Sequence, residues 1–257
     1  MKVRSRYLAL ILAATLLGGL ALAACGGGDD KEAEAPPAAA GGAEGTTEAV
    51  EAPAPTDAFA ELESYRYALT ISLEGADLAD EGLGSASFDL TGSFVAPDRS
   101  QARIEGDLGG LALEEETITI GDRSWVRSGD VWEEGEASFD TADLAPNAFF
   151  AGFDPEELKI ITPTEETANG VDSLRYSVDE ADIEQLQALA NVFGGSDSLE
   201  DLPEEFSFDL WLAKDGGWPV RVVMTARGAA EGAAVAVELS MDITDVNDPD
   251  IEIEPPI

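Results

Sequence analysis

The sequence contains no histidine and one cysteine, Cys25. Histidine is the commonest general base near neutral pH and a common ligand of transition metals, so its absence disfavours both kinds of site. A single cysteine cannot form a disulfide within the chain, and the folded part must therefore be stabilised by its core. The Gly-x-Ser-x-Gly motif of hydrolases and glycine loops that cradle phosphates are also missing. We therefore expect no enzyme, no cofactor and no metal site.

Basic residues are scarce. The chain has 14 Lys and Arg against 53 Asp and Glu, a formal net charge of −39 at pH 7. Nucleic acid and anionic lipid headgroups bind to basic patches, and here the few basic residues are scattered along the chain. We therefore expect neither partner. The acidity fits a salty habitat, a preference for cations or simple solubility, and composition does not choose among these.

The many carboxylates raise two alternatives, glycoside hydrolysis by a pair of acids and calcium binding. Adjacent acids such as Glu114-Glu115-Glu116, Glu133-Glu134 and Glu165-Glu166 point to opposite faces when they lie in a strand, so we expect them to form solvated faces. The acids near the C-terminus lack the loop pattern and the glycine of an EF-hand. These residues are Asp245, Asp248, Asp250, Glu252 and Glu254.

Only one long apolar run is present, from Tyr7 to Ala24, and it follows Lys2, Arg4 and Arg6. This order is typical of a secretory signal peptide. A membrane-spanning helix needs about 20 apolar residues and usually a polar stop, whereas this run breaks at once into glycines and aspartates. We expect residues 1–24 to be removed, which leaves 11 basic against 53 acidic residues, a net charge of −42.

The end of this run, Leu22-Ala23-Ala24-Cys25, resembles the lipobox of bacterial lipoproteins: leucine, two small residues and a cysteine. The resemblance implies that the Cys25 thiol receives a diacylglyceryl group, that the lipoprotein signal peptidase cuts before it, and that the new amino group is often acylated. Such an anchor would hold the protein outside the cytoplasm, on the outer leaflet of the cytoplasmic membrane or on an outer membrane. The alternative is an ordinary signal peptide with an incidental cysteine.

Residues 26–57 consist almost wholly of Gly, Ala, Glu, Pro and Thr, and no aromatic residue occurs in them. Such a stretch cannot bury enough apolar surface to fold. We expect residues 25–57 to be the lipidated cysteine with a disordered acidic tether, which as a flexible chain would span roughly 30 Å root-mean-square. The remaining residues, 58–257, are enough for one domain.

Within this domain, apolar and polar residues alternate in many short segments separated by turn residues, which predicts β-strands. Helical signals occur twice: Asp154-Pro155 can cap and begin a helix that includes Leu158, and apolar residues at helical spacing predict a helix over about 180–193. The alternating segments are 65–73, 88–94, 102–108, 118–120, 125–127, 131–132, 174–178, 206–212, 220–226 and 235–243. We therefore predict an α+β, mainly β domain, with nine or ten antiparallel strands in one large sheet and two or three short helices.

Three segments, 92–99, 118–127 with Trp132, and 211–221, resemble strand and turn patterns of the LolA/LolB-like and LppX/LprG-like envelope lipoproteins. The segments are Gly-Ser-Phe-Val-Ala-Pro-Asp-Arg, Ile-Thr-Ile-Gly-Asp-Arg-Ser-Trp-Val-Arg and Trp-Leu-Ala-Lys-Asp-Gly-Gly-Trp-Pro-Val-Arg. The resemblance implies a curved antiparallel half-barrel with helices over its concave face and an apolar cavity between them. It also implies a hydrophobic ligand, such as a lipid, a glycolipid or the acyl chain of a lipoprotein, and envelope transport or sorting proteins as partners.

The apolar stripes supply candidates for the lining of such a cavity. The candidates are Leu69, Ile71, Phe88, Phe94, Phe208, Leu210, Val222, Met224 and Leu239. The same side chains could instead fill a solid core, which would suit a surface lipoprotein with a structural or protein-interaction role. Two departures from the family matter: the tether favours holding or presenting a ligand over shuttling it, and the acidity disfavours anionic headgroups.

Overall fold

The computed structural model describes residues 55–75, 85–137, 144–150, 158, 161–179, 205–230 and 233–256. Within them lie two short helices, α2 (Pro55–Ala60) and α4 (Pro146–Phe149), and eleven strands. The strands are β1 (Ser64–Gly75), β2 (Ser85–Val95), β3 (Arg99–Leu108), β4 (Leu111–Ile120), β5 (Arg123–Ser128), β6 (Val131–Glu134), β7 (Thr164–Ala168), β8 (Val171–Asp179), β9 (Glu205–Ala213), β10 (Pro219–Ala230) and β11 (Ala233–Thr244). No helix in these residues is long and apolar enough to cross a membrane.

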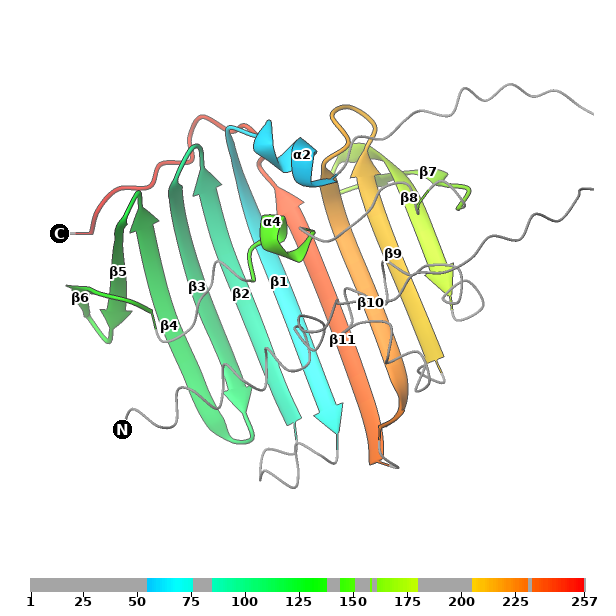
Figure 1. Cartoon of the computed structure of the whole chain (residues 1–257), viewed down its shortest axis with the longest axis horizontal. Coiled ribbons are helices and arrows are strands. Elements are labelled where there is room, and N and C mark those ends of the chain that lie inside the picture. The colour runs from blue at the N-terminus through cyan, green and yellow to red at the C-terminus, as the bar shows by residue number, and fades with distance from the viewer. Residues whose placement is uncertain are drawn as a thin grey trace, which may run out of the picture.

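All eleven strands belong to one antiparallel sheet, in the order β6-β5-β4-β3-β2-β1-β11-β10-β9-β8-β7 (Figure 1). Strands β1 to β6 follow one another toward one edge, and β7 to β11 run from the other edge back to the middle. The first strand pairs there with the last, from Arg66 opposite Thr244 to Gly75 opposite Val235. The two halves of the chain therefore build one continuous surface.

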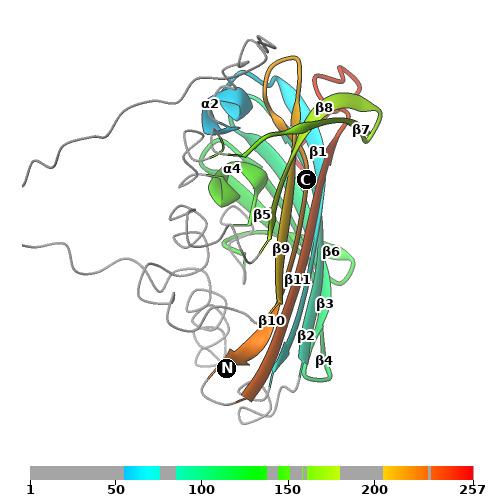
Figure 2. The ribbon, with the colours of Figure 1, turned by 90° about the vertical axis from the view of Figure 1, so that its right-hand side faces the viewer.

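The alternation of the sequence gives this sheet two different faces. In β1, Tyr65, Tyr67 and Leu69 are buried, whereas Arg66 and Ala68 between them are exposed. The sheet curves around α2 and α4, which lie on its concave face (Figure 2). Buried side chains of the strands gather on that face, because alternate residues of a strand point to the same side. The predicted large curved sheet with short helices over its concave face is confirmed.

Ten of the eleven strands coincide with the predicted segments. The eleventh, β7, lies at an edge of the sheet, and its Thr-Glu-Glu-Thr-Ala sequence lacks the apolar alternation that reveals a strand. Helix α4 was not predicted either, because it has only four residues and no side chain caps its start. The helix expected over 180–193 lies outside the described residues, as does the helix expected after Asp154 apart from Leu158. Helix α2 begins at Pro55, inside the stretch expected to be the tether.

After β11 the chain passes the start of β1 and runs across the ends of the neighbouring strands to the C-terminus, which lies near β5 (Figure 1). The Asn247 backbone N–H donates to the Ser64 carbonyl oxygen at 2.8 Å, and the Ser64 hydroxyl donates to the Asp248 carbonyl oxygen at 3.0 Å. Further on, Ile253 packs with Ile118 and Trp125 in a second, smaller core. Ile118 and Trp125 are register partners on the convex face, so the C-terminal segment covers part of that face.

Candidate ligand-binding face

The concave face consists of rows of side chains that run across the strands from β4 to β8. Residues directly opposite each other in an antiparallel pair point to the same side, so the strand register defines each row. One row contains Glu115, Ile104, Leu90, Leu69, Met241, Val222, Leu210 and Tyr176. The next contains Leu113, Gly106, Phe88, Ile71, Leu239, Met224, Phe208 and Val178. The second row is apolar across all eight strands, and the first is apolar from Ile104 to Leu210, between Glu115 at one end and Tyr176 at the other.

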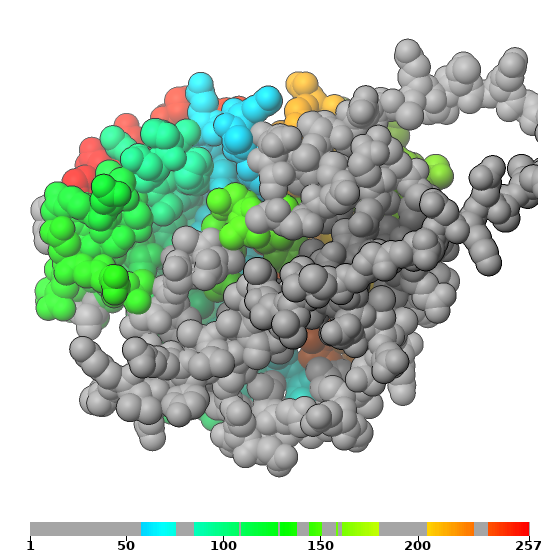
Figure 3. All heavy atoms as spheres, in the orientation of Figure 1, coloured from blue at the N-terminus to red at the C-terminus, as the bar shows by residue number. Residues whose placement is uncertain are grey.

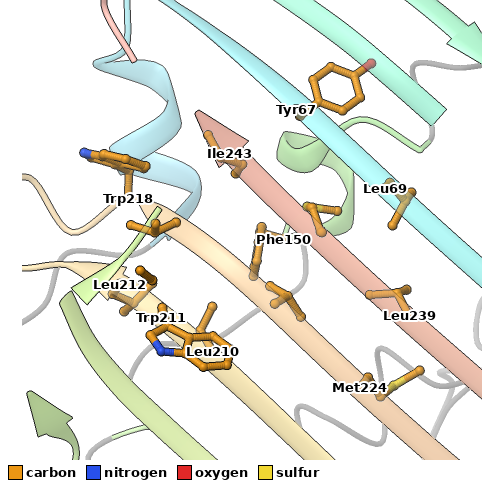
Figure 4. Close-up of a cluster of buried hydrophobic side chains, with 14 of the residues drawn as sticks. Tyr67, Leu69, Phe150, Leu210, Trp211, Leu212, Trp218, Met224, Leu239 and Ile243 are labelled. Atoms are coloured by element: carbon orange, nitrogen blue, oxygen red, sulfur yellow. The ribbon is translucent and has the colours of Figure 1, made fainter. Parts of the chain in front are cut away.

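All nine predicted cavity residues lie on this face. Seven of them belong to the main hydrophobic cluster, whereas Ile71 and Phe94 are partly buried and pack against it. Leu210 has no exposed surface and Val222 is 1% exposed. Figure 4 shows Leu69, Met224 and Leu239 on neighbouring strands of the cluster. That these side chains line a cavity stays a prediction. The lipobox residues and Cys25 lie outside the described residues.

The helices meet the face at an aromatic cluster near the start of β1. Phe59 of α2 lies 5.5 Å from Tyr65 and 5.9 Å from Phe150 between ring centroids, and Tyr65 stacks on Phe94 at 5.3 Å. Burial raises the pKa of Tyr67 to about 12, and burial together with the charge of Tyr67 raises the pKa of Tyr65. The space-filling view shows α2 and α4 on this side of the sheet (Figure 3). The aromatic side chains of this cluster therefore cover this end of the concave face.

Two glycines let aromatic rings lie flat against the sheet. A Cβ atom at Gly92 would lie 2.3 Å from Cζ of Tyr67, its register partner on β1. A Cβ atom at Gly106 would lie 2.3 Å from the Ser87 carbonyl oxygen and 2.9 Å from Cδ1 of Phe88. Only glycine leaves room for such a close approach in the middle of a strand. These pairs depend on strand register, so the sequence alone does not predict them.

The concave face also carries a carboxylate, Glu115, for which the prediction of a solvated position is wrong. Glu115 was expected to belong to a solvated run, yet it is only 8% exposed and pairs in register with buried Ile104. Its neighbours Glu114 and Glu116 do point to the convex face, where they bind Arg103 and Arg127. The prediction that adjacent acids point to opposite faces is therefore confirmed. Placing Glu115 on the concave face would have required the knowledge that Leu113 and Thr117, two residues to either side, point there.

Ion pairs cover the convex face. Arg175 of β8 bonds to Asp209 at 3.0 Å, and its guanidinium lies 5.1 Å from the centre of the Trp211 ring. Arg221 lies over the same ring at 5.6 Å, and the Trp211 indole N–H donates to Glu166 at 3.2 Å. The hydrogen bond to Asp209 raises the pKa of Arg175. The basic side chains of this face are thus engaged with carboxylates and with an aromatic ring.

No protein-family model matches this chain, and no curated protein matches it. Among solved structures, it is similar to LprF from Mycobacterium bovis, with 12% identity, a TM-score of 0.39, and coverage of 79% of this chain and 93% of that one. A LolA superfamily protein from Nitrosomonas europaea matches with 12% identity, a TM-score of 0.29, and coverage of 76% and 94%.

A third similar structure is a putative outer membrane lipoprotein-sorting protein domain from Vibrio parahaemolyticus. It has 14% identity and a TM-score of 0.26, and the match covers 77% of this chain and 91% of that one. These are the kinds of protein that the sequence resemblance named.

Proposed function

We propose that this chain is an extracytoplasmic lipoprotein, anchored through acyl groups on Cys25, that binds or transfers a hydrophobic ligand. The ligand is a lipid, a glycolipid or the acyl chain of a lipoprotein, and it lies against the concave face. The observation that carries the proposal is the apolar row from Leu113 to Val178 across eight strands, which within the described part of the chain faces α2 and α4 and no second sheet.

The width of this face supports the proposal. Seven strand spacings separate β4 from β8, roughly 34 Å at about 4.8 Å each. The helices described on this face have six and four residues, so they are about 9 Å and 6 Å long. Other cover must come from elsewhere in the chain or from a ligand, and we assign part of it to a ligand. Exposed apolar surface of this extent is otherwise unfavourable in water.

A tethered protein of this kind receives, holds or presents its ligand more naturally than it shuttles one. Its partners would then be transport or sorting proteins of the cell envelope, which approach a domain held near the membrane by Cys25. The negative charge of the chain opposes self-association and disfavours adhesion to anionic lipid.

A second candidate is a surface lipoprotein with a solid core and a structural or interaction role. The complete burial of Leu210 and the 1% exposure of Val222 favour it, because side chains at the centre of an open cavity would retain more surface. The two candidate functions differ in whether a ligand co-purifies with the protein.

Native mass spectrometry of the full chain with Cys25→Ser, purified from a bacterium and followed by lipid extraction, tests the ligand. The substitution ensures that any lipid found is not covalently attached. The proposal predicts a mass increment that disappears on extraction, and lipid in the extract. If no acyl compound co-purifies and none binds from a lipid panel, the chain is not a carrier.

The anchor is tested separately by comparing Cys25→Ser with the unsubstituted chain in the same cells. We expect the unsubstituted chain to partition into detergent and to carry the mass of added acyl groups, and the variant to remain uncleaved before residue 25 and unlipidated. Equal masses and equal partitioning of the two chains would exclude lipidation at Cys25.

A further inference from the structure

One part of the concave face, in the middle of the sheet, is not fully buried. A third row of register partners there consists of Ala86, Leu73, Val237, Ala226 and Phe206, on β2, β1, β11, β10 and β9. Its two flanking members, Ala86 and Phe206, are 2% and 5% exposed, whereas the three between them are only partly buried. Ile71, the next residue on the same side of β1, is also partly buried. We call Ile71, Leu73, Ala226 and Val237 the apolar window.

The window lies at the end of the sheet away from the aromatic cluster. Leu73 is near the end of β1 and Tyr65 is near its start, and the eight residue steps between them span roughly 26 Å. In the space-filling view, cyan atoms of β1 and orange atoms of the β10–β11 pair are visible from the concave side, below α4 (Figure 3). The apolar surface that remains exposed is therefore remote from the rings that cover the other end of the face.

Closer to the aromatic cluster, the protein fills the face itself. Leu69, Met241 and Val222, neighbours in one row, are 3%, 0% and 1% exposed. These side chains have almost no apolar surface left to bury, so a ligand gains nothing by lying over them. The free energy of hydrophobic binding comes from apolar surface that is still in contact with water. On the middle strands of the concave face, that surface is the window.

The window offers a ligand only hydrocarbon contacts. On the described strands β2, β1, β11, β10 and β9, every side chain that points to the concave face is apolar except for Tyr65 and Tyr67, which lie at the other end. The charged residues of the same stretches point to the convex face, where Arg227 bonds to Glu238 at 2.8 Å. Burial of a polar group without a hydrogen-bond partner is unfavourable. The part of a ligand that lies on the window is therefore hydrocarbon.

From these observations we infer, building on the proposed function, that the acyl chain of a lipid contacts the sheet at the apolar window. The polar head of the lipid lies away from these five strands. The protein therefore recognises the length of the acyl chain, and exchanging one uncharged head for another has little effect on affinity.

The position of the ligand is tested with single cysteines in the full chain, in which Cys25→Ser removes the one native thiol. Leu73→Cys places a thiol in the window, and Ser72→Cys is the matched control, because Ser72 is the adjacent residue, is also partly buried and points to the convex face. The rate of reaction with a maleimide is measured with and without lauroyl monoacylglycerol. At about ten times Kd, we expect the Leu73→Cys thiol to react about tenfold more slowly, since only the ligand-free fraction reacts. The Ser72→Cys thiol should keep its rate.

Thermal unfolding of each variant checks that it is folded. If Leu73→Cys does not fold, Val237→Cys provides the second test, since it places a thiol on β11 in the same row. Its matched control is Glu238→Cys, the next residue along β11, which is exposed on the convex face. We expect the same difference within this pair.

The recognised part of the ligand is tested with monoacylglycerol and lysophosphatidylcholine, two heads without net charge, each with acyl chains of 8, 10 and 12 carbons. Titrations of the Cys25→Ser chain followed by native mass spectrometry measure the affinities. We expect the affinity to rise about fifteenfold for every two methylenes, because each buried methylene contributes about 0.8 kcal/mol. Exchange of the head at constant chain length should change the affinity by less than about threefold, because a head that stays hydrated keeps its hydrogen bonds to water.

Equal protection of the two thiols of a pair, or protection of neither by a bound probe, would overturn the place of the ligand. A change of head that outweighs a change of two methylenes would overturn recognition of the chain. Both results leave a lipid carrier in place. Binding of no probe at any chain length would instead overturn the proposed function itself, so the failures are distinguishable.

Discussion

Gly92 and Tyr67 provide a direct test of how the concave face is built. An alanine at position 92 would place its Cβ atom 2.3 Å from Cζ and 2.4 Å from the hydroxyl oxygen of Tyr67. The ring has little freedom to move, because it is buried at 5% exposure and lies 6.2 Å from the ring of Tyr65. We expect Gly92→Ala to lower the free energy of unfolding by about 2 kcal/mol, as overpacking of a core does. The Tm should fall by roughly 4–8 °C.

Urea and thermal unfolding followed by circular dichroism measure this effect. Gly135→Ala is the control, since no atom lies within 4 Å of its Cβ position, and we expect a change of less than about 0.5 kcal/mol. Tyr67→Leu should remove most of the penalty of Gly92→Ala in a double-mutant cycle, because the ring that it meets is gone. Equal costs for the two alanine variants, or additive effects in the cycle, would refute the claim that the ring of Tyr67 requires glycine at this position.

Three further predictions address the core, the buried tyrosine and the convex face. Leu210→Ala should lower the free energy of unfolding by about 2–5 kcal/mol in urea titrations, because Leu210 is fully buried at the centre of the main cluster. The pKa of Tyr67 is raised to about 12, so the folded state keeps a proton that the unfolded state loses above about pH 10. The contribution of Tyr67 to stability should therefore be constant below about pH 10 and fall by about 2 kcal/mol as the pH rises to 12, and Tyr67→Phe should reduce that fall. Arg175→Gln should cost about 1 kcal/mol because its ion pair with Asp209 is only partly buried, and it should change the fluorescence of Trp211, over which the guanidinium lies.

The strands could be predicted because one face of the sheet is apolar and the other is polar. Every second residue from Tyr65 to Leu73 in β1 and from Val237 to Ile243 in β11 belongs to the core or packs against it, so the alternation is visible along both segments. The nine cavity candidates were found by the same signal, and they do lie on one face. Strand β7 escaped the prediction because it is an edge strand with exposed Glu165 and Glu166, and an edge strand buries too little to need alternation.

The site was less predictable than the strands, because its features depend on register. Nothing in the sequence pairs Gly92 with Tyr67 or Gly106 with Phe88, since these residues come from different strands. The burial of Glu115 was not predicted, because it belongs to a run of three glutamates and such a run is typical of a solvated surface. Alternate residues of a strand point to opposite faces of the sheet. Which residues of β4 point to the concave face is clear only once Ile104 is known to lie opposite Glu115.

Stability and ligand binding draw on the same surface of this sheet. Convex ion pairs such as Arg66 with Asp245, whose side chains are 48% and 42% exposed, each contribute about 0–1 kcal/mol. Each fully buried apolar side chain of the concave face, such as Met241, contributes about 1.5–3 kcal/mol. The folded state is therefore held mainly by the face to which we assign the ligand. A lipid that binds only the folded chain raises the free energy of unfolding, and the increase grows with the logarithm of the lipid concentration relative to Kd. A rise in stability on addition of lipid therefore indicates binding as directly as the mass of a bound ligand does.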